Sequence, residues 1–260
     1  MEFCKTLALT LNRINYSNTS QIATFYTLHY GKLQALARGS KRMGKKALGS
    51  IDLFSYNEII FLKKETSQLH LLTEWEVLEG FPAFRKDIER FYSACYVVEL
   101  LNELSEEGEP DSPLFYLLLD TLFGLSRNDN KDLNLLAFEL QLLRHLGYLP
   151  ELGECTQCGE KFLRNSGAVL SPFRKGLLCK ECASDIAGAQ VRLRRMPLHL
   201  SPAAIGAANF LVDCKRSSLN RLHLPKKVLE ELRSLSAEYL SQILDRPIGH
   251  WRCLQTIAKI

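Results

Sequence analysis

The sequence predicts an α+β protein of several domains, in which a small antiparallel β-barrel precedes an all-helical domain that carries an inserted site of four cysteines. Three observations predict this fold class. Short runs of alternating hydrophobic and polar residues fill the first eighty positions, as half-buried strands require. Beyond Gly80-Phe81-Pro82, hydrophobic residues recur at helical spacing, and two Cys-x-x-Cys pairs later interrupt the helices. We expect domain boundaries that divide the chain into residues 1–80, 81–154, 155–182 and 183–260.

Five short strands joined by turns are expected in the first eighty residues. Leu7, Leu9 and Leu11 alternate with alanine and threonine, and the polar cluster at residues 17–20 is typical of a turn. β-branched and aromatic residues then predict a strand that ends before Gly31. Five such strands favour a closed barrel, because closure removes the sheet edges that would otherwise stay exposed. The expected strands lie near residues 6–11, 22–30, 32–38, 51–63 and 69–77.

Helices are expected from about residue 84 onward. A hydrophobic stripe at helical spacing begins at Phe84, and Gly108-Glu109-Pro110 ends it. Asp111-Ser112-Pro113 is a start signal, because proline is tolerated in the first turn of a helix. Gly147 supplies a cap after the third helix. The later helices are expected near residues 112–125, 132–146, 201–214 and 225–245.

The two cysteine pairs predict a structural zinc site. Cys155 and Cys158 form the first pair, Cys179 and Cys182 form the second, and twenty residues separate the pairs. This spacing is typical of four-thiolate zinc sites, in which two short pairs close a tetrahedron around one ion. Four sulfur ligands leave no position for water or substrate, so such a site would stabilise the fold rather than catalyse a reaction. Two disulfides, or four unrelated buried cysteines, are the alternatives.

Composition and charge favour a protein of the reducing cytosol with an anionic partner. Hydrophobic residues make up 46% of the 260 residues, no apolar run is long enough for a membrane span, and we see no secretory signal. Eight cysteines, four of them in a zinc pattern, suit a compartment in which thiols stay reduced. The net charge of +4 is uneven, because residues 84–154 carry 6 Lys and Arg against 14 Asp and Glu, whereas residues 183–260 carry 12 against 6. Such asymmetry fits a polyanion that contacts only some surfaces, and a chance distribution of surface charge is the alternative.

One basic segment is the candidate nucleic-acid contact. Residues 32–50 contain six Lys or Arg, three Gly and no Asp or Glu. Glycine disfavours regular helix or strand here, and the cations can displace counterions from phosphates. Aromatic residues of the expected barrel, Phe25, Tyr26, Tyr30 and Phe61, could stack on bases or could simply form the core. The candidate DNA-binding residues are Lys32, Arg38, Lys41, Arg42, Lys45 and Lys46.

No enzyme motif is complete in this sequence. Residues 39–46 have the Gly-x4-Gly-Lys skeleton of a phosphate-binding loop, but Lys46 stands where a serine or threonine would hold magnesium. The zinc-protease motif and the nucleophile motif of hydrolases do not occur, and the six histidines are scattered. We therefore expect a protein that is not an enzyme and has no catalytic residues. A metalloenzyme is a further hypothesis, which requires an open position on the metal.

Two smaller basic clusters follow the first cysteine pair. Arg174 and Lys175 lie between the pairs, and Arg192, Arg194 and Arg195 follow the second pair. Either cluster could extend a nucleic-acid track or receive an acidic peptide. A protein-interaction adaptor with a structural zinc site and only incidental nucleic-acid contact is therefore the alternative function.

A series of short motifs gives the chain a family likeness. The motifs are Gly31-Lys32 leading to Ala37-Arg38-Gly39, then Leu78-Glu79-Gly80-Phe81-Pro82, Leu146-Gly147-Tyr148-Leu149-Pro150, Ser171-Pro172 and Gly176-Leu177-Leu178-Cys179. In this order and spacing they resemble the family of the bacterial recombination mediator RecO over about residues 1–185. No single motif is specific, and beyond Cys182 the likeness is only to a helical tail.

The resemblance implies an N-terminal OB-fold, then a helical domain with an embedded zinc site, in a cytoplasmic protein associated with the nucleoid. It implies binding to single- and double-stranded DNA and strand annealing without ATP. It also implies RecR and the C-terminal tail of the single-strand-binding protein as partners, so that RecA is loaded in gap repair. Relatives often carry acidic residues or glycine after the first strand, where this chain has Ser17-Asn18-Thr19-Ser20. Some relatives lack the cysteines, so the zinc prediction rests on this chain itself.

Overall fold

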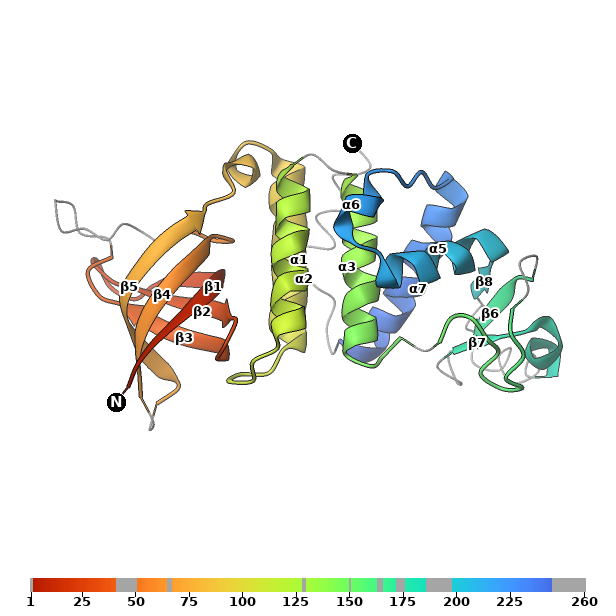
Figure 1. Cartoon of the computed structure of the whole chain (residues 1–260), viewed down its shortest axis with the longest axis horizontal. Coiled ribbons are helices and arrows are strands. Elements are labelled where there is room, and N and C mark those ends of the chain that lie inside the picture. Colours follow the sequence, from red (N-terminus) through yellow and green to blue (C-terminus); the bar gives the residue numbers. More distant parts are fainter. Residues whose placement is uncertain are drawn as a thin grey trace. The chain divides into compact units, whose positions relative to one another are not determined.

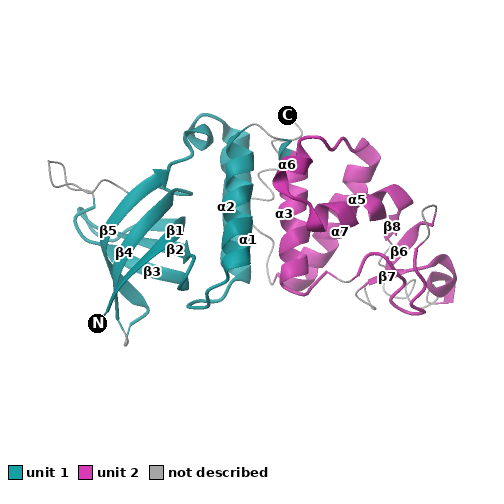
Figure 2. Cartoon of the chain, viewed as in Figure 1, with its two compact units in different colours: residues 1–131, 248–260 teal, residues 132–247 magenta. Residues whose placement is uncertain are grey.

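A computed structural model of the chain describes residues 2–40, 51–64, 67–127, 130–149, 151–162, 166–171, 176–185 and 198–244. The chain forms two compact units, one of residues 1–131 with 248–260 and one of residues 132–247 (Figure 2). The four predicted domains, residues 1–80, 81–154, 155–182 and 183–260, stay a prediction, because these two units do not test their boundaries. Within the described ranges, no helix has the length and apolar character that a membrane crossing requires.

The first unit begins with a closed five-stranded barrel, which confirms the predicted fold of this region (Figure 1). The strands close in the order β1-β2-β3-β5-β4, with antiparallel neighbours except for the parallel pair β3 and β5. The fourth strand is shorter than expected, because residues 51–55 form a turn before it. The strands are β1 (Glu2–Asn15), β2 (Gln21–Thr27), β3 (Gly31–Ala37), β4 (Tyr56–Lys63) and β5 (Leu69–Glu79).

The barrel interior is filled by alternate side chains of the strands, as the two-residue period of a strand requires. Phe25 and Phe61 are fully buried there, and Ala8 and Ala35 leave room for them. Tyr26 is also buried, with 1% of its surface exposed. Of the four aromatic residues that the sequence offered either to bases or to the core, Phe25, Tyr26 and Phe61 therefore belong to the core.

Three helical segments complete the first unit, namely η1 (Pro82–Arg85), α1 (Ile88–Leu104) and α2 (Ser112–Ser126). The Asp87 carboxylate accepts hydrogen bonds from the backbone N–H groups of Glu89 and Arg90, which caps α1. Asp111 caps α2 in the same way through the N–H of Leu114. The predicted start at Asp111-Ser112-Pro113 is confirmed.

The connection between α1 and α2 packs on the start of β3. The backbone N–H of Gly108 donates to the carbonyl of Lys32 at 2.9 Å. Gly31 has a positive φ of 63°, and a Cβ atom there would lie 2.2 Å from the carbonyl oxygen of Glu109. Only glycine fits this close approach of two backbones.

The second unit contains α3 (Lys131–His145, shared at its first residue with the first unit), α5 (Pro202–Asp213), α6 (Arg216–Leu219) and α7 (Lys226–Ile243). Ser201 caps α5 by accepting from the N–H of Ala204. The amide of Gln141 on α3 donates to the carbonyl of Leu211 on α5 at 2.7 Å. These helices confirm the predicted helical region, with bounds within a few residues of those expected.

The sequence did not predict a three-stranded sheet in the second unit. Its order is β7-β6-β8, with β6 (Ala168–Ser171), β7 (Gly176–Leu178) and β8 (Leu198–Leu200). These strands have only three or four residues, too few for a two-residue period to be recognised. The sheet joins the cysteine segment to residues beyond Cys182, because β8 pairs with β6.

Candidate metal centre and nucleic-acid surface

The four predicted ligand cysteines converge on one point in the second unit. The sulfur atoms of Cys155, Cys158, Cys179 and Cys182 all lie within 4.8 Å of one another. The sulfurs of Cys158 and Cys179 are 3.9 Å apart. Two pairs that lie far apart in the sequence therefore form one cluster, which could hold a metal ion.

Local backbone contacts place each cysteine pair. The N–H of Cys155 donates to the carbonyl of Glu160, and the N–H of Gly159 donates back to the carbonyl of Cys155. Gly159 has a φ of +73°, so the knuckle turn after the first pair uses the left-handed region that glycine tolerates. The second pair follows β7 and enters the helical residues 180–185.

The two pairs are held together through β7. Thr156 donates from its backbone N–H to the carbonyl of Leu177 at 2.9 Å. A Cβ atom on Gly176 would lie 2.1 Å from the methyl group of Thr156, so the glycine allows this close packing. Cys155 and Cys179 are buried beside Leu178, whereas Cys158 is exposed. One side of the sulfur cluster is therefore shielded from water.

The electrostatic environment favours thiolate at Cys155. Burial disfavours its charged form, but hydrogen bonds from the backbone N–H groups of Cys158, Cys179 and Gln157 outweigh this and lower the pKa of Cys155 to about 6. Thiolate is the form that binds a metal. The hydrogen bond with the Cys179 side chain raises the pKa of Cys182 instead, so a thiolate that forms at Cys155 stands beside neutral thiols. None of the cysteines in the described part of the chain forms a disulfide, so the disulfide alternative is wrong for these four residues.

The basic segment leaves the barrel at Arg38, whose side chain is exposed. The candidate residues Lys41, Arg42, Lys45 and Lys46 lie outside the described residues. Arg174, Lys175, Arg192, Arg194 and Arg195 lie outside them as well.

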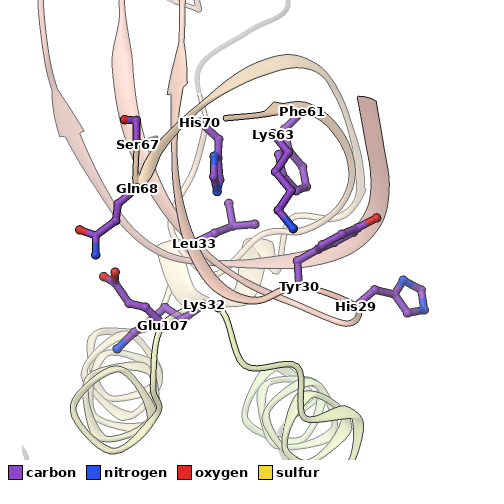
Figure 3. A pocket seen from close by; sticks show the side chains of 11 residues that line it. His29, Tyr30, Lys32, Leu33, Phe61, Lys63, Ser67, Gln68, His70 and Glu107 are labelled. Atoms are coloured by element: carbon purple, nitrogen blue, oxygen red, sulfur yellow. The ribbon is translucent and has the colours of Figure 1, made fainter. Parts of the chain in front are cut away.

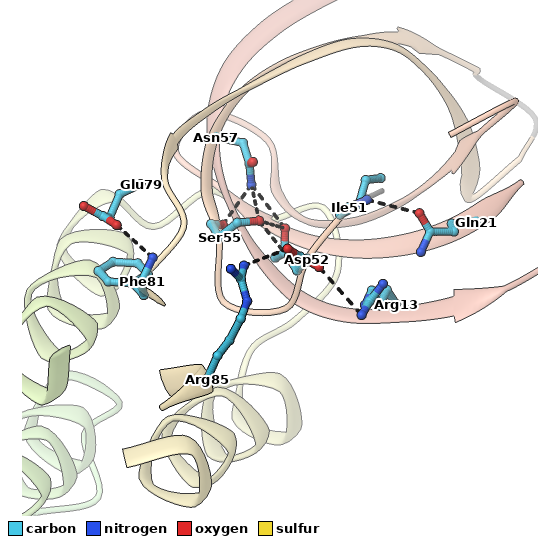
Figure 4. A network of polar contacts seen from close by, with 10 residues as sticks. Arg13, Gln21, Ile51, Asp52, Ser55, Asn57, Glu79, Phe81 and Arg85 are labelled. Carbon is cyan, nitrogen blue, oxygen red and sulfur yellow. Dashed lines mark hydrogen bonds and ion pairs between the residues drawn. The ribbon is translucent and has the colours of Figure 1, made fainter. Parts of the chain in front are cut away.

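The residues on either side of positions 41–50, the part of the basic segment that lies beyond β3, are tied to one buried side chain. The hydroxyl of Ser40 donates to Oε1 of Gln21 at 3.1 Å. The backbone N–H of Ile51 donates to the same oxygen, also at 3.1 Å (Figure 4). Gln21 is the first residue of β2, and only 1% of its surface is exposed. The segment therefore starts and ends at the same point on the barrel.

A polar network fixes the turn by which the chain rejoins the barrel (Figure 4). Asp52 forms ion pairs with Arg85 at 2.7 Å and with Arg13 at 3.7 Å. The amide of Asn57 donates to the backbone and side-chain oxygens of Ser55 at 2.8 and 3.0 Å. These contacts tie the turn to β1, to β4 and to η1.

Lys32, a candidate DNA-binding residue, and Tyr16 differ in how far their side chains are exposed. Lys32 is half-buried, and its ammonium group donates to the carbonyls of Asn102 and Ser105 at the end of α1, both at 2.7 Å. Tyr16 is 64% exposed in the turn after β1, and Ser20 of that turn accepts a hydrogen bond from the N–H of Gly39. The sequence does not single out Tyr16, because it lies in the turn after β1 rather than within an expected strand. The polar residues 17–20, which directly follow Tyr16, are the signal in the sequence that this side chain lies in an exposed turn.

Comparisons with known proteins cover both units. The family model described as Recombination protein O N terminal matches residues 1–81, and that described as Recombination protein O C terminal matches residues 85–252. The chain is 28% identical to the DNA repair protein RecO of Acetivibrio thermocellus, over 100% of this chain and 99% of that protein. It is 27% identical to the DNA repair protein RecO of Syntrophus aciditrophicus, over 98% and 96%. It is 31% identical to that of a Roseiflexus species, over 93% and 81%.

Proposed function

The chain belongs to the RecO family of DNA repair proteins, and on that premise we propose that it is a non-enzymatic mediator of recombination in gap repair. It binds single- and double-stranded DNA, promotes strand annealing and helps to load RecA on DNA that the single-strand-binding protein covers. Annealing of this kind needs no covalent chemistry, because neutralising and aligning two polyanions is sufficient. We propose that the protein works in the cytoplasm at the nucleoid, with RecR and the tail of the single-strand-binding protein as partners.

One observation carries the proposal: a segment rich in lysine and arginine starts and ends at Gln21 beside exposed side chains that suit DNA. Exposed Arg38 provides a cation where the basic segment leaves β3. Exposed Tyr16 provides a ring on which a base can stack. Lys41, Arg42, Lys45 and Lys46 contact the phosphate backbone in this proposal. Lys32 is the sixth predicted contact, but we assign it to the packing of α1, because its ammonium group already donates to two carbonyls at the end of that helix.

The salt dependence of binding tests this proposal. The logarithm of the affinity for a labelled single-stranded oligonucleotide falls with the logarithm of salt concentration, with a slope of magnitude about 3–5 if most of the segment binds. Reversing the charges at Lys41, Arg42, Lys45 and Lys46 flattens that slope. Fluorescence anisotropy at several salt concentrations measures it.

A matched pair of variants controls for net charge. Lys45→Glu with Lys46→Glu weakens binding, whereas Lys226→Glu with Lys227→Glu, at the start of α7, changes it little. If the quadruple variant keeps the slope of the unmodified protein, the segment is not part of the DNA site. If the unmodified protein does not bind oligonucleotides even at low salt concentration, the proposed function is wrong.

We further propose that the four cysteines hold a structural zinc ion. Sulfur ligands at about 2.3 Å from zinc stand about 3.8 Å apart in a tetrahedron, which agrees with the 3.9 Å between Cys158 and Cys179. Soft thiolates select zinc among the divalent metals that prefer tetrahedral sites. A fourfold sulfur shell leaves no open position for substrate, which supports a structural role. Zinc stoichiometry measured together with thiol accessibility, before and after chelation, tests the assignment.

The adaptor function is a second candidate, favoured by one cavity in the second unit. Its volume is about 350 Å³, and Phe210, Ser217, Ser218, Arg221 and Leu222 line it. Phe210 is 44% exposed. An apolar ring beside an arginine suits the end of an acidic peptide. Tight capture of a labelled acidic peptide together with weak oligonucleotide binding would favour the adaptor over the DNA-binding mediator.

A further inference from the structure

A cavity of about 680 Å³ opens at the end of the barrel where the turn between β2 and β3 lies (Figure 3). The turn between β2 and β3, the end of β4, the start of β5 and the connection between α1 and α2 line it. All these elements belong to the first compact unit. Pockets of this size bind small molecules or single groups of larger ones.

Three flat rings form one wall of the cavity. The rings of Tyr30 and Phe61 meet edge to face, with centroids 5.3 Å apart. The imidazole of His70 stacks on Phe61, with centroids 5.4 Å apart and planes 29° from parallel. Phe61 is fully buried, while Tyr30 and His70 are half-buried. Tyr30 and His70 therefore present aromatic surface to the cavity.

A cation and a neutral donor stand beside this wall. The ammonium group of Lys63 lies 5.7 Å from the centroid of the Tyr30 ring and points into the cavity (Figure 3). Nδ1 of His70 accepts a hydrogen bond from the backbone N–H of Lys64 at 3.3 Å. A neutral imidazole that accepts at Nδ1 carries its hydrogen on Nε2, so His70 offers a donor.

The charge state of His70 agrees with this assignment. Burial lowers the pKa of His70, and the nearby charges of Lys63 and Lys64 lower it further, so the ring is neutral at pH 7. Lys32 also borders the cavity, but two carbonyls hold its ammonium group. Glu107 stands on the opposite rim (Figure 3). Lys63 and Nε2 of His70 are therefore two donors beside the rings.

We propose that this cavity binds one nucleotide of a single-stranded nucleic acid, with its phosphate at Lys63 and Nε2 of His70 and its base against the aromatic wall. The inference rests on the proposed function and adds a second contact to it. Flat rings beside a cation suit a nucleotide, because any base can stack on an aromatic side chain while the cation neutralises the phosphate. A peptide rich in carboxylates would leave the aromatic wall unused.

The second contact lies one barrel length from the first. Gln21, which holds the basic segment, begins β2, and Tyr30 follows the end of β2 by three residues. Seven strand residues span roughly 20 Å at about 3.3 Å each. A strand of DNA that reaches both contacts gains affinity, because the second contact then forms at high effective concentration. Affinity should therefore increase steeply once an oligonucleotide is long enough to span both.

Two variants and one matched control test the inference with the full chain. Lys63→Met removes the charge and keeps the aliphatic stem, and His70→Phe keeps a ring against Phe61 but removes the donor. Lys5→Met, on β1 and outside the cavity, removes one exposed lysine from the same barrel as the control. Anisotropy with a labelled oligonucleotide of roughly 15 nucleotides measures affinity and salt slope. A second oligonucleotide with photoreactive 5-iodouracil reports contact through cross-links located by mass spectrometry.

We expect Lys63→Met to weaken binding about 5-fold or more and to reduce the salt slope by about 1. His70→Phe should weaken binding with the salt slope unchanged, and cross-links should fall in the peptides of Tyr30 or His70. If the unmodified protein binds DNA but both variants match Lys5→Met, the inference is wrong and the proposed function stands. Loss of acidic-peptide binding in Lys63→Met, with DNA binding intact, would overturn the inference in favour of a peptide site.

Discussion

A single glycine decides whether the α1–α2 connection can pack on the barrel. Replacing Gly31 by alanine forces a side chain into the left-handed region and against the backbone of Glu109. We expect Gly31→Ala to lower the free energy of unfolding of the first unit by about 1–3 kcal/mol. Denaturant unfolding followed by tyrosine and tryptophan fluorescence measures the change.

The α5 helix offers the control for this change. Gly206 lies inside α5, and a Cβ atom there would meet nothing within 4 Å. Gly206→Ala should therefore stabilise the second unit by about 0.5–1 kcal/mol, because alanine favours helix. If Gly31→Ala and Gly206→Ala changed the free energy of unfolding by the same amount and in the same direction, the close packing at Gly31 would contribute nothing to stability.

The protonation of His70 gives the barrel a pH dependence. Burial and two lysines lower the pKa of His70 below its ordinary value of 6.5. The unfolded chain then binds a proton where the folded chain does not, so the stabilising contribution of neutral His70 is lost as pH falls below about 6.5. Proton NMR of the imidazole should show a titration midpoint below 6.5. A midpoint above 6.5 would contradict the neutral donor assigned to His70.

Individual residues show how far the sequence could lead. The convergence of the four cysteines was predictable, because two Cys-x-x-Cys pairs at this spacing are typical of residues that surround one metal ion. The role of Lys32 was not, because its partners are carbonyls seventy residues further along the chain. The exposure of Tyr16 and the burial of Phe25 also depend on which face of a strand meets the core, and this needs the register of the barrel.

At the scale of elements, Lys32 joins β3 to the end of α1. Carbonyls at a helix end lack partners inside the helix, and a lysine there also complements the helix dipole. Lys32→Met keeps most of the packing but removes both hydrogen bonds. We expect a loss of about 1 kcal/mol in unfolding free energy and no change in the salt slope of DNA binding. A slope lower by about 1 at unchanged stability would instead make Lys32 a phosphate contact.

The helices were predictable where caps and breakers stand in the sequence. Asp111 with Pro113, and Ser201 with Pro202, mark starts that the structure confirms within a residue. The strands β6, β7 and β8 carry no such signal, because each has only three or four residues and because β7 and β8 both depend on pairing with β6. Their pairing is a property of the folded second unit rather than of any local stretch.

At the scale of the whole molecule, the candidate DNA contacts and the cysteine cluster belong to different compact units. Removing the proposed zinc ion should therefore destabilise the second unit, because the binding free energy of a structural metal is also folding free energy. Affinity and salt slope for single-stranded DNA should stay unchanged. Chelation with reversible thiol modification, followed by calorimetry and anisotropy on the same sample, checks both expectations. A DNA affinity that falls with the metal content would assign the cysteine segment to the DNA site.

The division into a barrel and a helical region with a cysteine insertion was predictable from changes in hydrophobic period. Barrel closure followed from the number of short strands, since open edges are unfavourable. The parallel pairing of β3 with β5 required the structure, because it joins strands separated by the whole basic segment and β4.

The way Gln21 anchors both Ser40 and Ile51 has an evolutionary consequence. Insertions or deletions between the two anchors fall outside every strand that the structure describes. Doubling the length of a flexible connection costs only about 0.6 kcal/mol in closure entropy. Natural selection can therefore change the length and the charge of residues 41–50 without changing the fold of the barrel. An engineer could graft a foreign binding sequence between the same two anchors.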